Sequence, residues 1–296
     1  MLYGPRWGYG IPLAFVLPGV LLWAPRWLWI VALSASFVLI PIMGFCVPWR
    51  TWGRSGDADF RVVSYNIQRY SVREEDFAVL LDEVQPDAIA VQECSGVGGY
   101  KRWNLPEPWH MHRASELMVG SRHPILRVEE FTCRWPPHRK HINAIYCVLD
   151  TPHGELGFCC LHLNTPRRGL SQVLNRGDIA LDKTDEAEQW NEWRRRESAE
   201  LAEWLSAFPE PKIIAGDFNM PVDSTIYQEY WSDYRNGFSR AGFGLGYTKQ
   251  TTIRRRTYGL RIDHILGDRF WRPTRCWVGP DLGSDHLPVI GEWAGD

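Results

Sequence analysis

Acidic, amide and imidazole side chains follow apolar runs at six places in this chain of 296 residues. These positions are Asn66, Glu93, His162 with Asn164, Asp217 with Asn219, Asp263, and the pair Asp285-His286. Such groups can hold a hard cation and transfer protons. One Asp or Asn at a strand end is commonly a turn former, but six such ends are hard to explain as turns. We therefore expect these side chains to form one site.

The apolar runs predict alternating strands and helices from Phe60 onward. Strand-like runs occupy residues 60–65, 88–91, 117–121, 142–149, 156–163, 212–215, 260–266, 275–278 and 287–293. Helical spacing marks residues 73–84 and 186–208, and in the second helix Arg194–Arg196 fall mainly on the polar face. This order predicts an α/β fold with several antiparallel neighbours, and polar residues at strand ends are where such sheets place their sites.

The first 50 residues differ from the rest, because no Asp or Glu precedes Asp57 and tryptophan is frequent. Ile11–Trp23 is one apolar run, and Trp27–Val47 is a second with 21 uncharged residues, enough to span about 30 Å of hydrocarbon. We predict a membrane anchor at 1–50, formed by one helix or a helical hairpin, a linker at 51–59 and a catalytic domain at 60–296. A signal peptide fits poorly without a small-residue cleavage site, and a buried soluble helix is the other alternative. Arginines flank the second run on both sides, so the orientation is left open.

Composition argues against several other classes. The net charge of −2 provides no general basic surface for nucleic acid. The seven cysteines form no CxxC pair and are odd in number, so neither a zinc site nor a disulfide framework is indicated.

Six motifs, in order along the chain, resemble those of the endonuclease/exonuclease/phosphatase family, which includes DNase I-like nucleases. They are Ser64-Tyr65-Asn66-Ile67, Val91-Gln92-Glu93, Leu161-His162-Leu163, Gly216-Asp217-Phe218-Asn219, Ile262-Asp263-His264-Ile265 and Gly283-Ser284-Asp285-His286-Leu287-Pro288. The similarity extends from about Asp59 to Trp293. It implies a four-layer α/β sandwich with two central mixed β-sheets, and cleavage of phosphate esters that depends on Mg²⁺ or, alternatively, Mn²⁺.

The resemblance also implies a metal site. Glu93 would be the primary ligand, which suits a hard cation that prefers oxygen, with Asn66 and Asp285 completing or supporting the site. Gln68 stands where some relatives carry a second acidic ligand, so we expect one tightly held ion.

The remaining roles concern water and phosphate. Asp217 would orient or deprotonate the attacking water, and Asn219 would donate amide hydrogens to the water or phosphate. His286 would act as general acid or base or polarise the phosphate, with Asp263 holding its tautomer. An ion pair of Asp263 with Arg261 or with arginines 254–256 is the alternative. Further candidates for phosphate contact are His162, Arg122 and Arg167.

An N-terminal anchor joined to such a domain resembles bacterial membrane-bound members of the family. We therefore expect the bacterial plasma membrane as the location and a phosphate ester as the substrate, with a lipid-linked phosphate or pyrophosphate favoured by the anchor. A nuclease acting on nucleic acid is the alternative function. A membrane-tethered, non-catalytic binding module is a third, which the complete set of acidic and imidazole positions disfavours.

Overall fold

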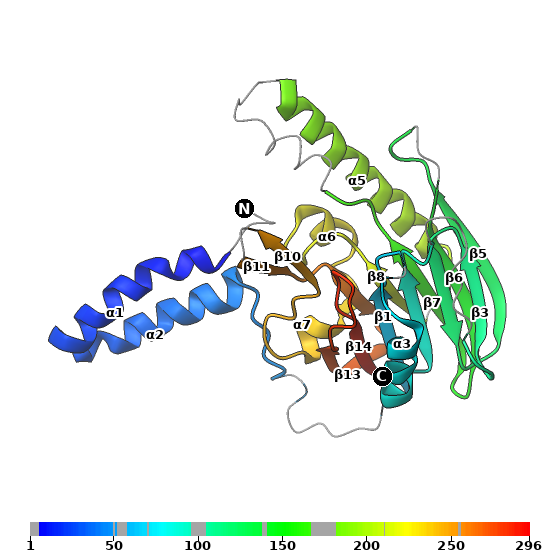
Figure 1. Cartoon of the computed structure of the whole chain (residues 1–296), viewed down its shortest axis with the longest axis horizontal. Helices are drawn as coiled ribbons and strands as arrows, with labels where there is room; N and C mark the ends of the chain where they lie inside the picture. Colours follow the sequence, from blue (N-terminus) through cyan, green and yellow to red (C-terminus); the bar gives the residue numbers. More distant parts are fainter. Residues whose placement is uncertain are drawn as a thin grey trace.

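The computed structural model describes residues 6–49, 51, 58–69, 71–95, 105–137, 141–166, 182–209, 211–253 and 256–296. Two mixed six-stranded sheets stand at its centre (Figure 1). The first has the order β13 (Trp271–Val278), β14 (Val289–Gly295), β1 (Phe60–Asn66), β2 (Ala88–Gln92), β4 (Leu117–Ser121) and β3 (His110–Ala114). The second has the order β5 (Ile125–Cys133), β6 (His141–Thr151), β7 (Gly154–His162), β8 (Lys212–Asp217), β12 (Asp263–Gly267) and β9 (Arg235–Asn236). A two-stranded ribbon pairs β10 (Lys249–Ile253) with β11 (Arg256–Leu260).

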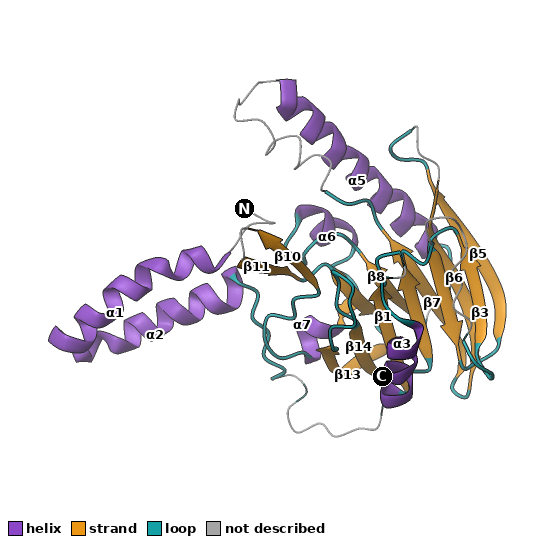
Figure 2. Ribbon diagram, in the orientation of Figure 1, coloured by secondary structure: helices purple, strands orange, loops and turns teal. Residues whose placement is uncertain are grey.

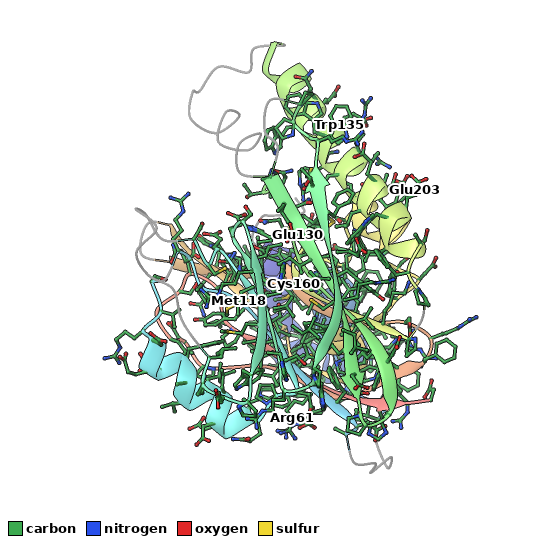
Figure 3. The ribbon with its side chains drawn as sticks, turned by 90° about the vertical axis from the view of Figure 1, so that its right-hand side faces the viewer. Arg61, Met118, Glu130, Trp135, Cys160 and Glu203 are labelled. Atoms are coloured by element: carbon green, nitrogen blue, oxygen red, sulfur yellow. The ribbon has the colours of Figure 1, made fainter. Side chains whose placement is uncertain are left out.

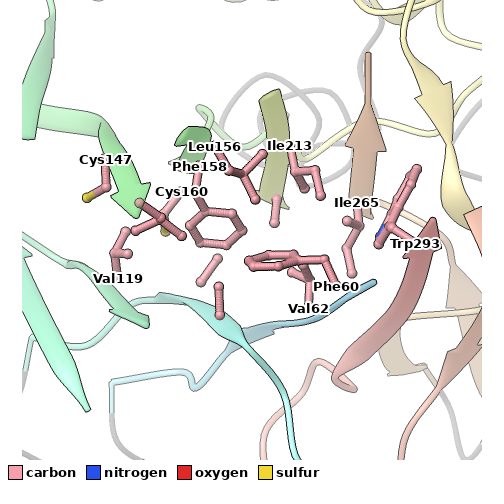
Figure 4. Close-up of a cluster of buried hydrophobic side chains, with 14 of the residues drawn as sticks. Phe60, Val62, Val119, Cys147, Leu156, Phe158, Cys160, Ile213, Ile265 and Trp293 are labelled. Carbon is pink, nitrogen blue, oxygen red and sulfur yellow. The ribbon is translucent and has the colours of Figure 1, made fainter. Parts of the chain in front are cut away.

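The two sheets pack face to face through alternate residues of their strands. Phe60 and Val62 of β1 meet Phe158 and Cys160 of β7 in this inner layer (Figure 4). Successive side chains of a strand point to opposite faces, so the intervening residues face outward. Each fully buried apolar side chain of this kind contributes about 2 kcal/mol to stability. The inner layer therefore fixes how one sheet lies on the other.

Helices cover the two outer faces (Figure 2). On the first sheet, Tyr65 packs with Phe77 and Leu80 of α3 (Glu74–Val84). On the second sheet, α5 (Asp182–Ser206) and α6 (Thr225–Tyr230) supply the covering side chains, among them Leu201. In the side view, Cys160 lies in the interior and Glu203 of α5 lies on the surface (Figure 3). The predicted four-layer α/β sandwich is confirmed.

Some local expectations differ from the structure. Arg194 is buried, with 4% of its surface exposed, whereas Arg195 is half-buried and Arg196 is exposed. The expected strand 260–266 is two elements, because β11 ends at Leu260 and β12 begins at Asp263. Strands β3, β5, β9 and β10, most of β11, and the short helices α6 and α7 (Gly237–Ala241) were not predicted. The expected linker 51–59 lies largely outside the described residues.

The N-terminal residues form two helices that lie side by side and project from the sheets (Figure 1). They are α1 (Ile11–Trp23), preceded by η1 (Arg6–Gly10), and α2 (Leu28–Phe37), with η2 (Pro25–Trp27) before it and η3 (Val38–Ile42) after it. Pro25–Ile42 is long and apolar enough to cross a membrane, with a mean hydropathy of 1.6. The second helix ends before the predicted Val47, because Gly44 turns the chain at φ +76° and Cys46 then pairs with Gly244.

One glycine fixes the approach of the second sheet's two parallel strands. Gly216 of β8 lies opposite Leu161 of β7, and a Cβ at Gly216 would overlap the Leu161 carbonyl oxygen. The residue before Asp217 must therefore be glycine, which has no side chain.

We predict that Gly216→Ala lowers the free energy of unfolding by about 3 kcal/mol or more, because backbone atoms must move to admit the methyl group. Gly154→Ala is the control: Gly154 also has a positive φ, +107°, but its added Cβ meets nothing within 4 Å. Backbone strain alone should cost this control about 1–2 kcal/mol. Equal losses for the two variants in chemical denaturation would contradict the role given to Gly216.

Candidate functional site

The polar strand ends predicted from the sequence meet at one edge of both sheets. In the first sheet, the carboxyl ends of parallel β1 and β2 bring Asn66 beside Gln92. In the second sheet, parallel β7 and β8 pair His162 with Asp217, and antiparallel β12 begins with Asp263 opposite Asp217. The remaining members come from the turns next to these strands: Glu93 after β2, and Asp285 and His286 before β14. The shared edge therefore follows from strand direction.

His286 and Asp263 form a buried hydrogen-bonded pair across the two sheets. Nδ1 of His286 lies 2.9 and 3.1 Å from the two oxygens of Asp263. Asp263 also accepts a bond from Thr248 Oγ1 at 2.5 Å. Arg261, an alternative ion-pair partner expected for Asp263, instead directs its guanidinium to Cys46 Sγ and Ser239 Oγ. The side chains of the other alternative partners, residues 254–256, lie outside the described part. Among the described residues, Asp263 therefore pairs with His286.

The other ring nitrogen of His286 faces acidic oxygens. Nε2 lies 3.7 Å from Asp217 Oδ2 and 3.9 Å from Asp285 Oδ1, distances beyond a normal hydrogen bond. With Nδ1 committed to Asp263, Nε2 is the nitrogen placed to exchange a proton with a bound molecule.

Asn66 joins the carboxylates of the two sheets. Its Nδ2 donates to Glu93 Oε1 at 3.2 Å and to Asp217 Oδ2 at 3.1 Å. Its Oδ1 accepts the main-chain N–H of Gln68 at 3.0 Å. Asn66 is fully buried, so this amide holds Glu93 and Asp217 at a fixed separation.

His162 lies on the other side of Asp217. Its Nδ1 is 2.8 Å from Glu116 Oε1, and its Nε2 is 3.6 Å from Asp217 Oδ2. The Asp217 carboxylate is thus placed between two imidazoles.

A brace from helix α5 holds the loops after β7 and β8. Buried Glu197 accepts the main-chain N–H of Asn164 at 2.9 Å and its side-chain amide at 2.8 Å. Arg194 donates to the carbonyls of Asn164 and Asn219, both at 2.9 Å. Asn219 directs an amide N–H to the Leu163 carbonyl at 2.8 Å. Asn219 therefore ties the two loops together, in addition to the substrate contact expected of it.

Asp285 reaches the site but carries a cationic partner. Its carboxylate forms an ion pair with Lys249, whose side chain is 8% exposed. Its main-chain N–H donates to Gln68 Oε1 at 3.1 Å.

Two sequence candidates are not brought to this cluster. Arg122 follows Ser121, which pairs with Ala88 at the opposite end of β2, about 15 Å from Glu93 by strand rise. There Arg122 donates to Gln85 and lies over the Trp109 ring. A direct contact of Arg122 with substrate at this edge does not fit its position. Arg167 lies outside the described residues.

Burial and charge divide the protons among these groups. Burial favours a lower pKa for His286, but the charges of Asp263 and Asp217 raise it above the usual value. The same competition raises the pKa of His162 to about 9, through Glu116 and Asp217. Burial, with the charge of Asp263, raises the pKa of Asp217, whereas His286 and Thr248 outweigh burial and lower that of Asp263. At neutral pH His162 is therefore a proton donor, the pKa of His286 is shifted in the same direction, and Asp217 is more basic than Asp263.

Two sets of groups could hold a cation. One ligand atom from each of Asp217, Asp263 and His286 lies within 4.8 Å of the others. However, the His286–Asp263 hydrogen bond occupies that space, and Mg²⁺ prefers oxygen to imidazole. Glu93 fits a cation better, because it is partly exposed and the one hydrogen-bond partner of its carboxylate among the described residues is the neutral amide of Asn66.

Sequence reasoning missed several residues of this site. Thr248, Lys249 and Glu116 come from segments without a strand-end motif, and no local pattern distinguishes them. Arg194 and Glu197 had a signal, because they follow Trp190 at i+4 and i+7 and so share its buried helix face.

His264, next to Asp263, is buried as a neutral ring. Its Nε2 donates to the Met220 carbonyl at 2.9 Å, and its Nδ1 accepts from the Asn236 amide at 3.2 Å. A second ring proton would face the Asn236 donor. Burial lowers the pKa of His264 to about 4.

The unfolded chain protonates His264 near pH 6.5, while the folded chain stays neutral until about pH 4. His264 therefore supports folding at neutral pH, and this support is lost as the pH falls through that window. We predict that the wild type loses about 3 kcal/mol more unfolding free energy than His264→Gln between pH 7 and pH 4, since Gln preserves both hydrogen bonds. Denaturation curves whose pH dependence is the same for both proteins would contradict this.

The comparisons with known proteins agree with this architecture. The model of the Endonuclease/Exonuclease/phosphatase family matches residues 63–286. No curated protein matches the chain. An endonuclease/exonuclease/phosphatase from Beutenbergia cavernae has a TM-score of 0.58 and 15% identity, over 80% of this chain and 72% of that one.

Two further solved structures have the same fold. The endonuclease/exonuclease/phosphatase from Bacteroides vulgatus gives a TM-score of 0.58 at 14% identity, over 80% of this chain and 99% of that one. The 3′ phosphatase NExo from Neisseria, bound to a product DNA hairpin, gives 0.54 at 17% identity, over 79% and 99%. The family match covers most of the chain and includes every strand end of the site. The chain therefore belongs to the endonuclease/exonuclease/phosphatase family and is a metal-dependent hydrolase of phosphate esters.

Proposed function

We propose that this hydrolase is anchored in a bilayer by its N-terminal helical hairpin and cleaves a lipid-linked phosphate or pyrophosphate, using one Mg²⁺ held at Glu93. The observation that carries the proposal is the attachment of an exposed apolar hairpin to the loops that bear the catalytic groups.

The hairpin presents apolar side chains that the protein itself leaves uncovered. Phe15, Leu22, Leu33 and Phe37 are each more than 60% exposed, and no residue of α1 is buried. Exposed apolar surface of this extent marks an interaction site. A lipid bilayer satisfies it, because the 18 residues of Pro25–Ile42 extend about 27 Å as a helix.

The ends of the hairpin match the two faces of a bilayer. Arg26 lies in the turn between the helices, and Trp23 and Trp29 beside it are 82% and 61% exposed. Trp49 is exposed at the end near the sheets. Tryptophan is enriched at membrane interfaces, so we place the turn at the far face and the catalytic domain at the near face, with Pro25–Ile42 as the span and the shorter α1 packed beside it.

Polar contacts hold the near end of the hairpin against segments that lie close in sequence to residues of the site. Arg6 forms an ion pair with Asp223 at 2.8 Å, and Cys46 exchanges two main-chain hydrogen bonds with Gly244. Arg261 donates to Cys46 Sγ at 3.0 Å. In sequence, Asp223 follows Asp217, Gly244 precedes Lys249 and Arg261 precedes Asp263. This attachment would keep the catalytic edge beside the bilayer, where lipid phosphates are concentrated.

The side chains divide the work of hydrolysis as follows. Asp217 takes a proton from the attacking water, because its raised pKa makes it the more basic carboxylate. His286, held by Asp263, directs its Nε2–H to the phosphate and supplies the proton that the leaving oxygen needs. His162 donates Nε2–H to a phosphate oxygen. Asn66 holds the carboxylates of Glu93 and Asp217 at a fixed separation.

Glu93 would be the primary ligand of the cation. When bound there, Mg²⁺ neutralises charge on the non-bridging oxygens of the phosphate. Mn²⁺, with similar oxygen ligands, is expected to substitute for it.

We predict that the full chain, reconstituted in vesicles with Mg²⁺, releases phosphate from polyprenyl diphosphate at least tenfold faster than it nicks plasmid DNA. Glu93→Gln should reduce this release about 100-fold or more, because the neutral amide loses the charge that holds the cation. Glu203→Gln, an exposed change of the same kind on α5, is the matched control and should retain activity. Plasmid nicking without release from any lipid would overturn the lipid assignment and support a nuclease.

A further inference from the structure

Lys249 is a buried cation in the site that no sequence motif marks. Its side chain is 8% exposed and its ammonium contacts the Asp285 carboxylate. The main chain of β10 fixes this position, because Lys249 forms a bridge with His286 and Gln250 N–H donates to the Asp285 carbonyl at 2.9 Å. Lysine is seldom buried unless it is paired or functional.

The carboxylates of the site are not equally neutralised. Asp263 is paired with His286, Asp217 lies between two imidazoles, and Asp285 is paired with Lys249. The Glu93 carboxylate, in contrast, has no cationic hydrogen-bond or ion-pair partner among the described residues: it accepts a hydrogen bond from the neutral amide of Asn66, and the His162 ring acts on it only through the longer-range effect of charge. A divalent cation therefore gains most at Glu93, while at Asp285 it would have to displace or adjoin an ammonium group.

We propose that Lys249 is a catalytic residue that binds a non-bridging oxygen of the substrate phosphate, and that it takes the place of a second metal ion at Asp285. An ammonium group has three N–H donors, and Asp285 orients it while using one of them. The adjoining His286 places the phosphate within the same part of the site. This inference rests on the proposed function for its substrate, but it concerns cation number and phosphate binding, which can be measured without turnover.

A lysine that binds phosphate and one that only supports the fold have different consequences. Removing a phosphate-binding cation weakens anion binding and, by removing repulsion, strengthens the binding of a nearby metal ion. Loss of a merely structural contact would disturb the site and weaken both. The two binding constants therefore discriminate between these roles.

The test measures Mn²⁺ binding and inorganic phosphate binding by calorimetry on the full chain in detergent. We expect the wild type to bind one Mn²⁺. Lys249→Met should bind inorganic phosphate about tenfold more weakly and Mn²⁺ as tightly or more tightly, with kcat for lipid-phosphate release reduced about 100-fold. Lys249→Arg, which keeps the charge, should stay within about fivefold of the wild type in phosphate affinity. Arg196→Met, an equal charge change on the exposed face of α5, should alter neither affinity.

Two Mn²⁺ ions in the wild type would overturn the proposal, as would weakened Mn²⁺ binding in Lys249→Met or unchanged phosphate affinity in that variant. If Lys249→Met does not fold, the wild-type stoichiometry and Lys249→Arg still decide the question. A wild-type chain that hydrolyses no phosphate ester would contradict the proposed function instead, and the two binding measurements would remain interpretable.

Discussion

The site depends on how the two sheets are positioned relative to each other, because each of its two central contacts joins one sheet to the other. Asn66 at the end of β1 bonds to Asp217 at the end of β8, and His286 before β14 bonds to Asp263 at the start of β12. Neither sheet alone holds a complete set of groups. The apolar layer between the sheets, which includes Phe60 and Phe158, is therefore what keeps the catalytic distances constant.

Burial of charge is the second constraint. Asp217 and Asp263 are 1% and 2% exposed and lie opposite each other on paired strands. Two adjacent buried carboxylates repel, and the structure relieves this with imidazoles on both sides of Asp217 and with an amide between Asp217 and Glu93. The same arrangement separates their roles: Asp263 stays ionised next to His286, while Asp217 becomes the better base.

The sequence predicted what local patterns encode. Lys212–Asp217 reads as a buried strand with a polar end, and strand direction then accounts for the meeting of Asn66, His162 and Asp217. Contacts between distant segments were not predictable in this way. Lys249 enters the site only because β10 bridges to His286, and Glu116 enters only because it meets the end of β7.

Edge strands and helix faces account for other differences. Strands β3 and β5 lie at the edges of their sheets and are largely exposed on both faces, so they lack the alternation that marks a half-buried strand. Arg194 was expected on the polar face because charged residues usually are, but its guanidinium is buried on two main-chain carbonyls. Arg122 matched a strand-end pattern, yet antiparallel β4 places it at the opposite edge.

The contact between His286 and Asp263 is the most direct test of the account, since it spans both sheets and sets the proton on Nε2. The measurement is kcat of Asp263→Asn with a generic bis-phosphodiester and Mg²⁺, beside its Mn²⁺ affinity and thermal unfolding. We predict a loss in kcat of about 100-fold or more, with Mn²⁺ affinity at Glu93 retained, because an amide neither stabilises the charged His286 ring nor fixes the tautomer of the neutral ring. A kcat within about threefold of the wild type in the folded variant would contradict it.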